Sequence, residues 1–280
     1  MAEITAASVG KLREMTGAGL MDCKKALTEA NGEIEIAVDL LRKKGVASAA
    51  KKSSRAANEG VIAQHIVPGA KVGILVEINC ETDFVAKNEG FRAFCDDIAK
   101  KLATNPAADL EADRIAAVAK LGENIVISRH QRIEVAGSGL VAAYIHTGAK
   151  VGVLVEVGAG KDATVSCEEF KQLVRDITLQ IAAAHPQAVS RDNLDPAAVA
   201  KEDEINRNSD RLKGKPAQAI DKILAGMREK FYQTHCLVDQ GFVKNPDQTV
   251  AQHIGETAKK LGDEISIRRF TRFQVGESAA

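Results

Sequence analysis

Short stretches of helical periodicity, separated by glycine, occupy the first fifty or so residues of the chain. Apolar residues recur every three or four positions in three segments, which predicts three helices. Thr5 can cap the first helix, and the glycines at 17 and 19 end it. The second helix is expected to end at Asn31-Gly32 and the third before Gly45. Three short helices joined by glycine turns can pack into a small bundle.

The centre of the chain contains an internal duplication. Residues 70–78 recur as residues 149–157, with seven of nine positions identical and a shift of 79 residues. Each copy opens with two β-rich runs around a short turn. The runs lie at 61–67, 72–79, 140–146 and 151–157. Each pair of runs predicts a β-hairpin.

A segment with one apolar stripe at helical spacing follows each hairpin. The stripes consist of Phe91, Phe94, Cys95, Ile98 and Leu102 in the first copy and of Phe170, Leu173, Val174, Ile177 and Ile181 in the second. Because the two stripes occupy matching positions, we expect both to face a core.

The end of the repeated unit also recurs, but at a different shift. Residues 120–135 resemble residues 260–275, an offset of 140 instead of 79, so the second copy carries 61 additional residues at roughly 187–247. Asp195-Pro196 and Lys215-Pro216 are suitable helix starts. Two helices joined by a short turn predict an antiparallel helical hairpin that projects from the second copy.

These patterns predict an α+β fold: a small N-terminal three-helix domain followed by a duplicated core of β-hairpin, helix and strand with an inserted helical hairpin. The three-helix unit resembles ubiquitin-associated domains. The expected domains are 1–55 (helical domain and basic linker), 56–138 (first core subdomain), 139–189 with 246–276 (second core subdomain) and 190–245 (inserted hairpin).

Composition narrows the class of function. The 38 basic and 38 acidic residues give zero net charge, and ten aromatic residues without tryptophan offer little surface for stacking on bases. A direct nucleic-acid role is therefore not expected. The five cysteines are scattered, which indicates reduced thiols. The N-terminal segment has no leader pattern and no apolar run reaches the ~20 residues of a membrane span, so we expect a cytoplasmic protein without a membrane partner.

Several motifs of enzymes fail on inspection. Gly158-Ala159-Gly160-Lys161 looks like a phosphate loop, but Asp162 follows the lysine and position 155 is not glycine. The segment 137–142 fits a dinucleotide fingerprint, yet it leads into a predicted strand rather than a helix. The six histidines lack metal-ligand spacing, and His235-Cys236 is an isolated pair. We therefore expect no enzyme, no catalytic residues, no metal and no cofactor.

The segment Thr82-Asp83-Phe84-Val85, between the second strand and the first core helix, differs from its counterpart in the second copy. Aspartate recurs there as Asp162, so Asp83 either caps a helix or serves a function. Phenylalanine is replaced by alanine. Phe84 could continue the apolar stripe of the core helix, or it could be an anchor for the pocket of a partner.

Two segments resemble the signature of the elongation factor Ts family. They are 79–88, Asn-Cys-Glu-Thr-Asp-Phe-Val-Ala-Lys-Asn, and 16–27, Thr-Gly-Ala-Gly-Leu-Met-Asp-Cys-Lys-Lys-Ala-Leu. With the duplicated core and the helical insert between and beyond them, the resemblance covers nearly the whole chain. Some members carry a further helical C-terminal module, whereas this sequence stops shortly after the last predicted strand, so that contact is expected to be missing.

The resemblance implies a guanine nucleotide exchange factor for elongation factor Tu. Such a protein binds the GDP-bound and nucleotide-free GTPase, disturbs its magnesium and phosphate site and promotes GDP release so that GTP can bind. By analogy, Thr82, Asp83, Phe84 and Val85 would act at the magnesium site, Leu12, Leu20 and Met21 would dock a second surface, and His146 would contact a domain remote from the nucleotide.

The residues alone also permit another class of protein. The basic segment 43–55 is either a solvated helix or linker, or an interaction tail. As a tail, together with the insert, it would favour a ribosome- or RNA-associated protein. Salt dependence of RNA binding separates that class from an exchange factor.

Overall fold

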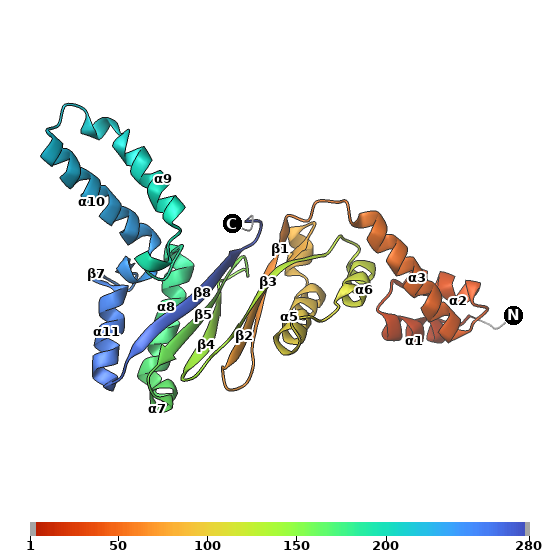
Figure 1. Ribbon diagram of the computed structural model, residues 1–280. Helices are drawn as coiled ribbons and strands as arrows, with labels where there is room; N and C mark the ends of the chain where they lie inside the picture. The colour runs from red at the N-terminus through yellow and green to blue at the C-terminus, as the bar shows by residue number, and fades with distance from the viewer. Residues whose placement is uncertain (1–3, 278–280) are drawn as a thin grey trace.

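The computed structural model describes residues 4–277; the first three residues of the N-terminal segment and the last three of the C-terminal end lie outside it. Two three-stranded sheets form the centre, with a helical unit at one end and a helical arm at the other (Figure 1). The helices are α1 Ala6–Thr16, α2 Leu20–Glu29, α3 Ile34–Lys52, α4 Asp83–Lys87, α5 Glu89–Thr104, α6 Glu111–Leu121, α7 Asp162–Ser166, α8 Glu168–Ala184, α9 Pro196–Arg207, α10 Ala217–His235 and α11 Val250–Leu261. The strands are β1 Glu59–Ile66, β2 Val72–Cys80, β3 Val126–Glu134, β4 Gly139–Ile145, β5 Val151–Ala159, β6 Gly241–Phe242, β7 Asn245–Thr249 and β8 Ile265–Gln274.

The two sheets have the same topology, which confirms the α+β class and the two predicted hairpins. One sheet has the order β1-β2-β3 and the other β4-β5-β8, with antiparallel pairs throughout. The register shifts between Glu77 and Ile78 in β2 and between Glu156 and Val157 in β5. These positions are 79 residues apart, so the irregularity is duplicated with the fold.

The sheets pack face to face on the duplicated glycines. A Cβ atom on Gly73 would lie 2.6 Å from Ile66 and from Val141, and one on Gly152 would lie 2.5 Å from Ile62. Because real Cβ atoms do not approach so closely, a larger residue at either glycine would separate the sheets. The presence of glycine at this position in both copies therefore has a packing cause.

Reciprocal hydrogen bonds relate the two copies by an approximate two-fold axis. The Ile62 N–H donates to the Ala149 carbonyl at 2.7 Å, and the matching Val141 N–H donates to the Ala70 carbonyl at 2.8 Å. The Lys71 ammonium likewise donates to a carbonyl at the start of β4. Its twin Lys150 donates to the start of β1. The two copies thus pack against each other with approximate two-fold symmetry, like the subunits of a dimer.

The long helices α5 and α8 cover the outer faces of the two sheets. Their predicted stripes are buried as expected, with Phe91 and Phe170 fully enclosed; Phe94, which is half-buried, is the exception. The shorter α6 and α11 occupy equivalent places in the two copies, since both precede the last strand of their sheet (Figure 1).

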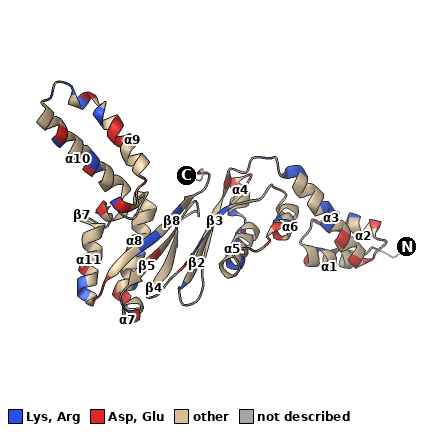
Figure 2. Cartoon of the chain, viewed as in Figure 1, with Lys and Arg blue, Asp and Glu red and all other residues tan. Residues whose placement is uncertain are grey.

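The third helix was expected to end before Gly45, and this prediction is wrong. Helix α3 continues to Lys52, so most of the basic segment is helical (Figure 2). Gly45 is buried, and a Cβ atom there would lie 3.6 Å from Ile115 and from Ala119 of α6. Tertiary packing on α6 therefore outweighs the low helix propensity of glycine. One helix joins the N-terminal unit to the first sheet.

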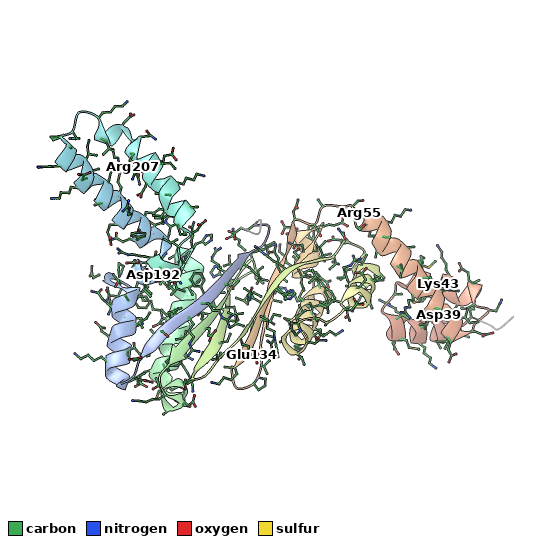
Figure 3. The ribbon with its side chains drawn as sticks, viewed as in Figure 1. Asp39, Lys43, Arg55, Glu134, Asp192 and Arg207 are labelled. Atoms are coloured by element: carbon green, nitrogen blue, oxygen red, sulfur yellow. The ribbon has the colours of Figure 1, made fainter. Side chains whose placement is uncertain are left out.

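The inserted residues form the expected antiparallel helical hairpin, with α9 and α10 projecting from the second sheet (Figure 1). Asp195 caps α9 and Pro196 is its first residue. Arg191 fixes the root of the arm, because its guanidinium lies 2.6 Å from both Glu229 of α10 and Asp239 beyond it. Arg207, the last residue of α9, lies on the arm (Figure 3). The small β6-β7 hairpin at the root was not anticipated.

Candidate functional site

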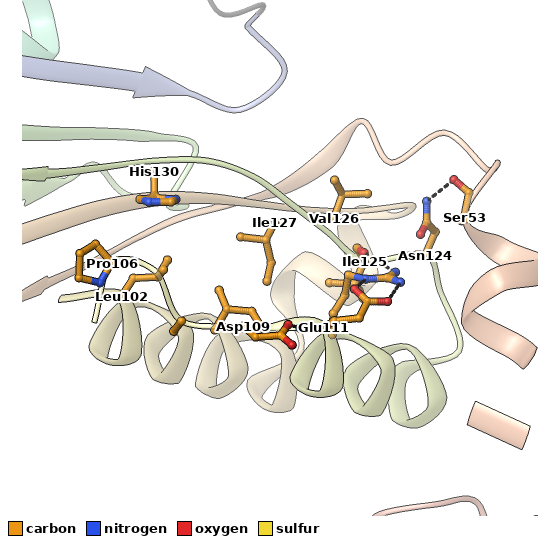
Figure 4. Close-up of a pocket in the computed structure, with 13 residues that line it drawn as sticks. Ser53, Leu102, Pro106, Asp109, Glu111, Asn124, Ile125, Val126, Ile127 and His130 are labelled. Atoms are coloured by element: carbon orange, nitrogen blue, oxygen red, sulfur yellow. Dashed lines mark hydrogen bonds and ion pairs between the residues drawn. The ribbon is translucent and has the colours of Figure 1, made fainter. Parts of the chain in front are cut away.

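The described residues offer no metal cluster and no membrane span. Between Ile4 and Glu277 no group of three or more His, Cys, Asp or Glu side chains could hold a metal ion. No helix in that range is long and apolar enough to cross a membrane. A cavity of about 460 Å³ lies between α6 and β3, lined by Leu102, Leu110, Ile125, Ile127 and His130 (Figure 4). Of its charged residues, Glu111 and Arg114 pair with each other, and Asp109 accepts the backbone N–H of Glu111 at 3.0 Å.

Phe84 is the most exposed of the large apolar side chains in the described part of the chain. It lies in the short helix α4 directly after β2, and 81% of its surface is accessible, while Phe91 in the next helix is fully buried. Phe84 therefore does not continue the core stripe. Its neighbour Ala86 is buried and Val85 is half-buried, so α4 rests on the core with Phe84 facing outward.

Of the two roles left open for Asp83, the structure does not support the helix cap. Thr82 is the cap, since its hydroxyl accepts from the Val85 N–H at 3.3 Å. Asp83 is the first residue of α4 and lies 2.6 Å from the Lys87 ammonium, one turn further on. The hydrogen bond from Lys87 lowers the pKa of Asp83, so the carboxylate is ionised at neutral pH.

Glu81 and Thr82, the two residues that lead from β2 into α4 and to Phe84 (the Phe84 loop), are held from two sides. The Cys80 thiol donates to the Thr82 carbonyl at 3.2 Å, and burial raises the pKa of this thiol to about 12. From the other side, Glu123 accepts hydrogen bonds from Glu81 and Thr82. Glu123 was not singled out in the sequence because it follows Thr82 by 41 residues.

The second copy presents the same local fold without the aromatic side chain. Helix α7 follows β5 as α4 follows β2, and Ala163 stands where Phe84 stands. Lys161 precedes α7 but makes no side-chain cap. The exposed phenylalanine is therefore not a requirement of the duplicated fold.

The three residues of the N-terminal unit that were expected to contact a partner differ in their exposure to solvent. Leu12 is fully buried among α1, α2 and α3, so its predicted contact role is wrong; its side chain holds the bundle together. Leu20 and Met21 at the start of α2 are 53% and 62% exposed, and Met15 of α1 is 60% exposed. Large apolar side chains in water are available to a partner surface.

His146 lies in the exposed turn between β4 and β5. Its Nδ1 atom is 3.0 Å from the Tyr144 hydroxyl. Beside it is a cavity of about 370 Å³ lined mostly by apolar residues, among them Leu179, Ala182 and Val243. Apart from the buried Leu12, the predicted site residues thus lie at three separate places, the start of α4, α2 and the β4-β5 turn, rather than in one pocket. Such an arrangement suits a large partner better than a small ligand.

Comparisons with known proteins agree in one result. The family model described as "Elongation factor TS" matches residues 81–277. A relative named "Elongation factor Ts" from Nitratidesulfovibrio vulgaris is 42% identical over 279 residues, covering 99% of this chain and 97% of the relative. Relatives of the same name from Trichlorobacter lovleyi and Clostridium botulinum are each 44% identical, covering 98% of this chain and 93% of their own length.

Proposed function

The chain belongs to the elongation factor Ts family of translation elongation factors, and on this premise we propose that it is the guanine nucleotide exchange factor of elongation factor Tu. In this proposal it acts in the cytoplasm, by binding rather than by covalent chemistry. It binds the GDP-bound GTPase and lowers the affinity for GDP. GDP leaves, and GTP then displaces the factor.

The observation that carries this proposal is the rigid presentation of Phe84. An aromatic side chain that is exposed in the free protein and mounted on a hydrogen-bonded loop loses little conformational freedom when it enters a partner. Phe84 inserts between helices of the GTPase close to the magnesium ion and the phosphates. The ionised Asp83 and the backbone of the loop disturb the coordination of that ion.

Two further contacts hold the factor in place. Leu20 and Met21 dock a second surface of the GTPase, and His146 contacts a domain remote from the nucleotide. Because α3 packs on α6, the N-terminal unit and the Phe84 loop belong to one framework. Binding at one place therefore aligns the other.

Thermodynamic reciprocity gives the direct test of this proposal. If the protein weakens GDP binding by some factor, GDP must weaken binding of the protein to elongation factor Tu by the same factor. Calorimetric titration of elongation factor Tu with this protein, with and without saturating GDP, measures one side of the cycle. Titration of GDP into the GTPase and into its complex measures the other. Equal affinities with and without GDP would refute an exchange function.

A further inference from the structure

An acidic residue clamps the loop that carries Phe84. One carboxylate oxygen of Glu123 accepts the N–H groups of Glu81 and Thr82, each at 3.0 Å. Its other oxygen accepts the Thr82 hydroxyl at 2.5 Å. The same hydroxyl oxygen caps α4 through Val85. Glu123 thus fixes the residue that determines where α4 begins and in which direction it runs.

Residues 81–82 and 123–124 hold each other by hydrogen bonds in both directions, and these contacts extend to the residues after helix α3. The Asn124 N–H donates to the Glu81 carboxylate at 2.6 Å, while the Asn124 side-chain amide donates to the Arg55 carbonyl at 2.8 Å. Figure 4 shows Asn124 beside Ser53 at the end of the cavity. The Arg55 guanidinium also lies 3.5 Å from Glu81. Residues 123 and 124 therefore connect the Phe84 loop to the helix that leads from the N-terminal unit.

The second copy contains the corresponding acid, Asp263. Like Glu123, it follows the glycine that ends a helix, Gly122 after α6 and Gly262 after α11. Its carboxylate accepts the Lys161 N–H at 3.0 Å and a threonine hydroxyl at 2.5 Å, but that threonine is Thr164. Both copies thus have an acidic clamp, and only the first copy uses it to set a helix cap in front of an exposed aromatic residue.

We infer that Glu123 is the positioning residue of the Phe84 loop. By holding residues 81 and 82, it orients Phe84 toward the partner in a fixed relation to the N-terminal unit. The inference rests on the proposed function and extends it to a residue that acts through Phe84. Without the clamp, Phe84 stays exposed but samples several directions, and the partner must select one of them. Loss of the clamp therefore lowers the rate of GDP exchange and does not only reduce the stability of the fold.

A fluorescence measurement on the free full-length protein tests the positioning. The chain has no tryptophan, so Phe84→Trp supplies a single reporter at the site. In that background we expect Glu123→Ala to lower the fluorescence anisotropy of the reporter and Asp263→Ala, the matched control, to leave it unchanged. An unchanged anisotropy in the Glu123 variant, or an equal fall in both, would overturn the inference.

A double-mutant cycle on GDP release tests the consequence. We expect Glu123→Ala to reduce the stimulated release rate by roughly two- to tenfold, the equivalent of ordering one side chain on binding. In the Phe84→Ala background the same change should have almost no further effect, since its effect passes through Phe84. Independent, multiplicative losses would overturn the inference.

Two provisions keep the result decisive. If Glu123→Ala does not fold, Glu123→Gln, which keeps the length and one acceptor oxygen, takes its place in both measurements. If the wild-type protein does not accelerate GDP release, the proposed function fails, whereas the anisotropy measurement on the free protein still decides whether Glu123 positions residue 84.

Discussion

Truncation of three phenylalanines separates the residue that serves a partner from those that hold the fold. Phe91 and Phe170 are fully buried at equivalent positions of the two cores, so alanine at either should cost ~3–5 kcal/mol in unfolding free energy. Phe84 is 81% exposed. With ~200 Å² for an aromatic side chain and ~25 cal/mol per Å², its covered fifth contributes at most ~1 kcal/mol.

Thermal unfolding followed by circular dichroism provides the measurement. One kcal/mol corresponds to about 2–4 °C for a domain of 150–250 residues. We therefore expect Phe84→Ala to melt within a few degrees of wild type, and both Phe91→Ala and Phe170→Ala to melt at clearly lower temperatures. If Phe84→Ala is destabilised as strongly as Phe91→Ala, the residue belongs to the core, and the reasoning from its exposure is refuted.

Three other predictions concern the rest of the chain. The double variant Leu20→Ala, Met21→Ala should bind elongation factor Tu at least tenfold more weakly, as expected for an interface hot spot of about 2 kcal/mol. Ile205→Ala, an equally exposed control on α9, should bind as tightly as wild type. Calorimetric titration measures both affinities, and equal effects of the two variants would refute the N-terminal contact. Replacement of α9, α10 and their connecting loop by a short glycine–serine linker should leave a remainder that melts cooperatively, because the arm packs mainly on itself; loss of a cooperative transition in scanning calorimetry would contradict this. At pH 7.5 a thiol reagent should rapidly modify only the half-exposed Cys167, since the four other cysteines are buried. Burial also raises the pKa of Cys80 to about 12, so this thiol stays protonated until the pH approaches that value. Fast reaction of two or more thiols in the native protein would contradict the burial.

Local periodicity made most of the core predictable. The hairpins and the stripes on α5 and α8 follow from alternation and helical spacing within each copy, and the duplication supplied an independent repeat of each pattern. The length of α3 was not predictable in this way. Gly45 reads as a helix end in the sequence, and only its packing against α6 explains why the helix continues.

The candidate site was predictable in composition but not in geometry. Thr82 and Asp83 are both good capping residues, and their order in the sequence does not decide which hydroxyl or carboxylate reaches the Val85 N–H. Leu12 lies in the same N-terminal unit as the exposed Leu20 and Met21, yet its position on α1 turns its side chain into the bundle. Glu123 acts on Thr82 across 41 residues. A signal for it existed: the shift of 140 residues aligns it with Asp263, an acid after the same glycine.

Stopped-flow release of a fluorescent GDP from elongation factor Tu tests the central claim most directly. The GTPase is mixed with excess unlabelled GDP and increasing concentrations of this protein, wild type or Phe84→Ala. We expect the wild-type protein to accelerate release to a plateau, and Phe84→Ala, which stays folded, to reach a plateau at least tenfold lower, as for the loss of a hot-spot residue. Equal plateaus for the two proteins would contradict the claim that the exposed Phe84 drives GDP out.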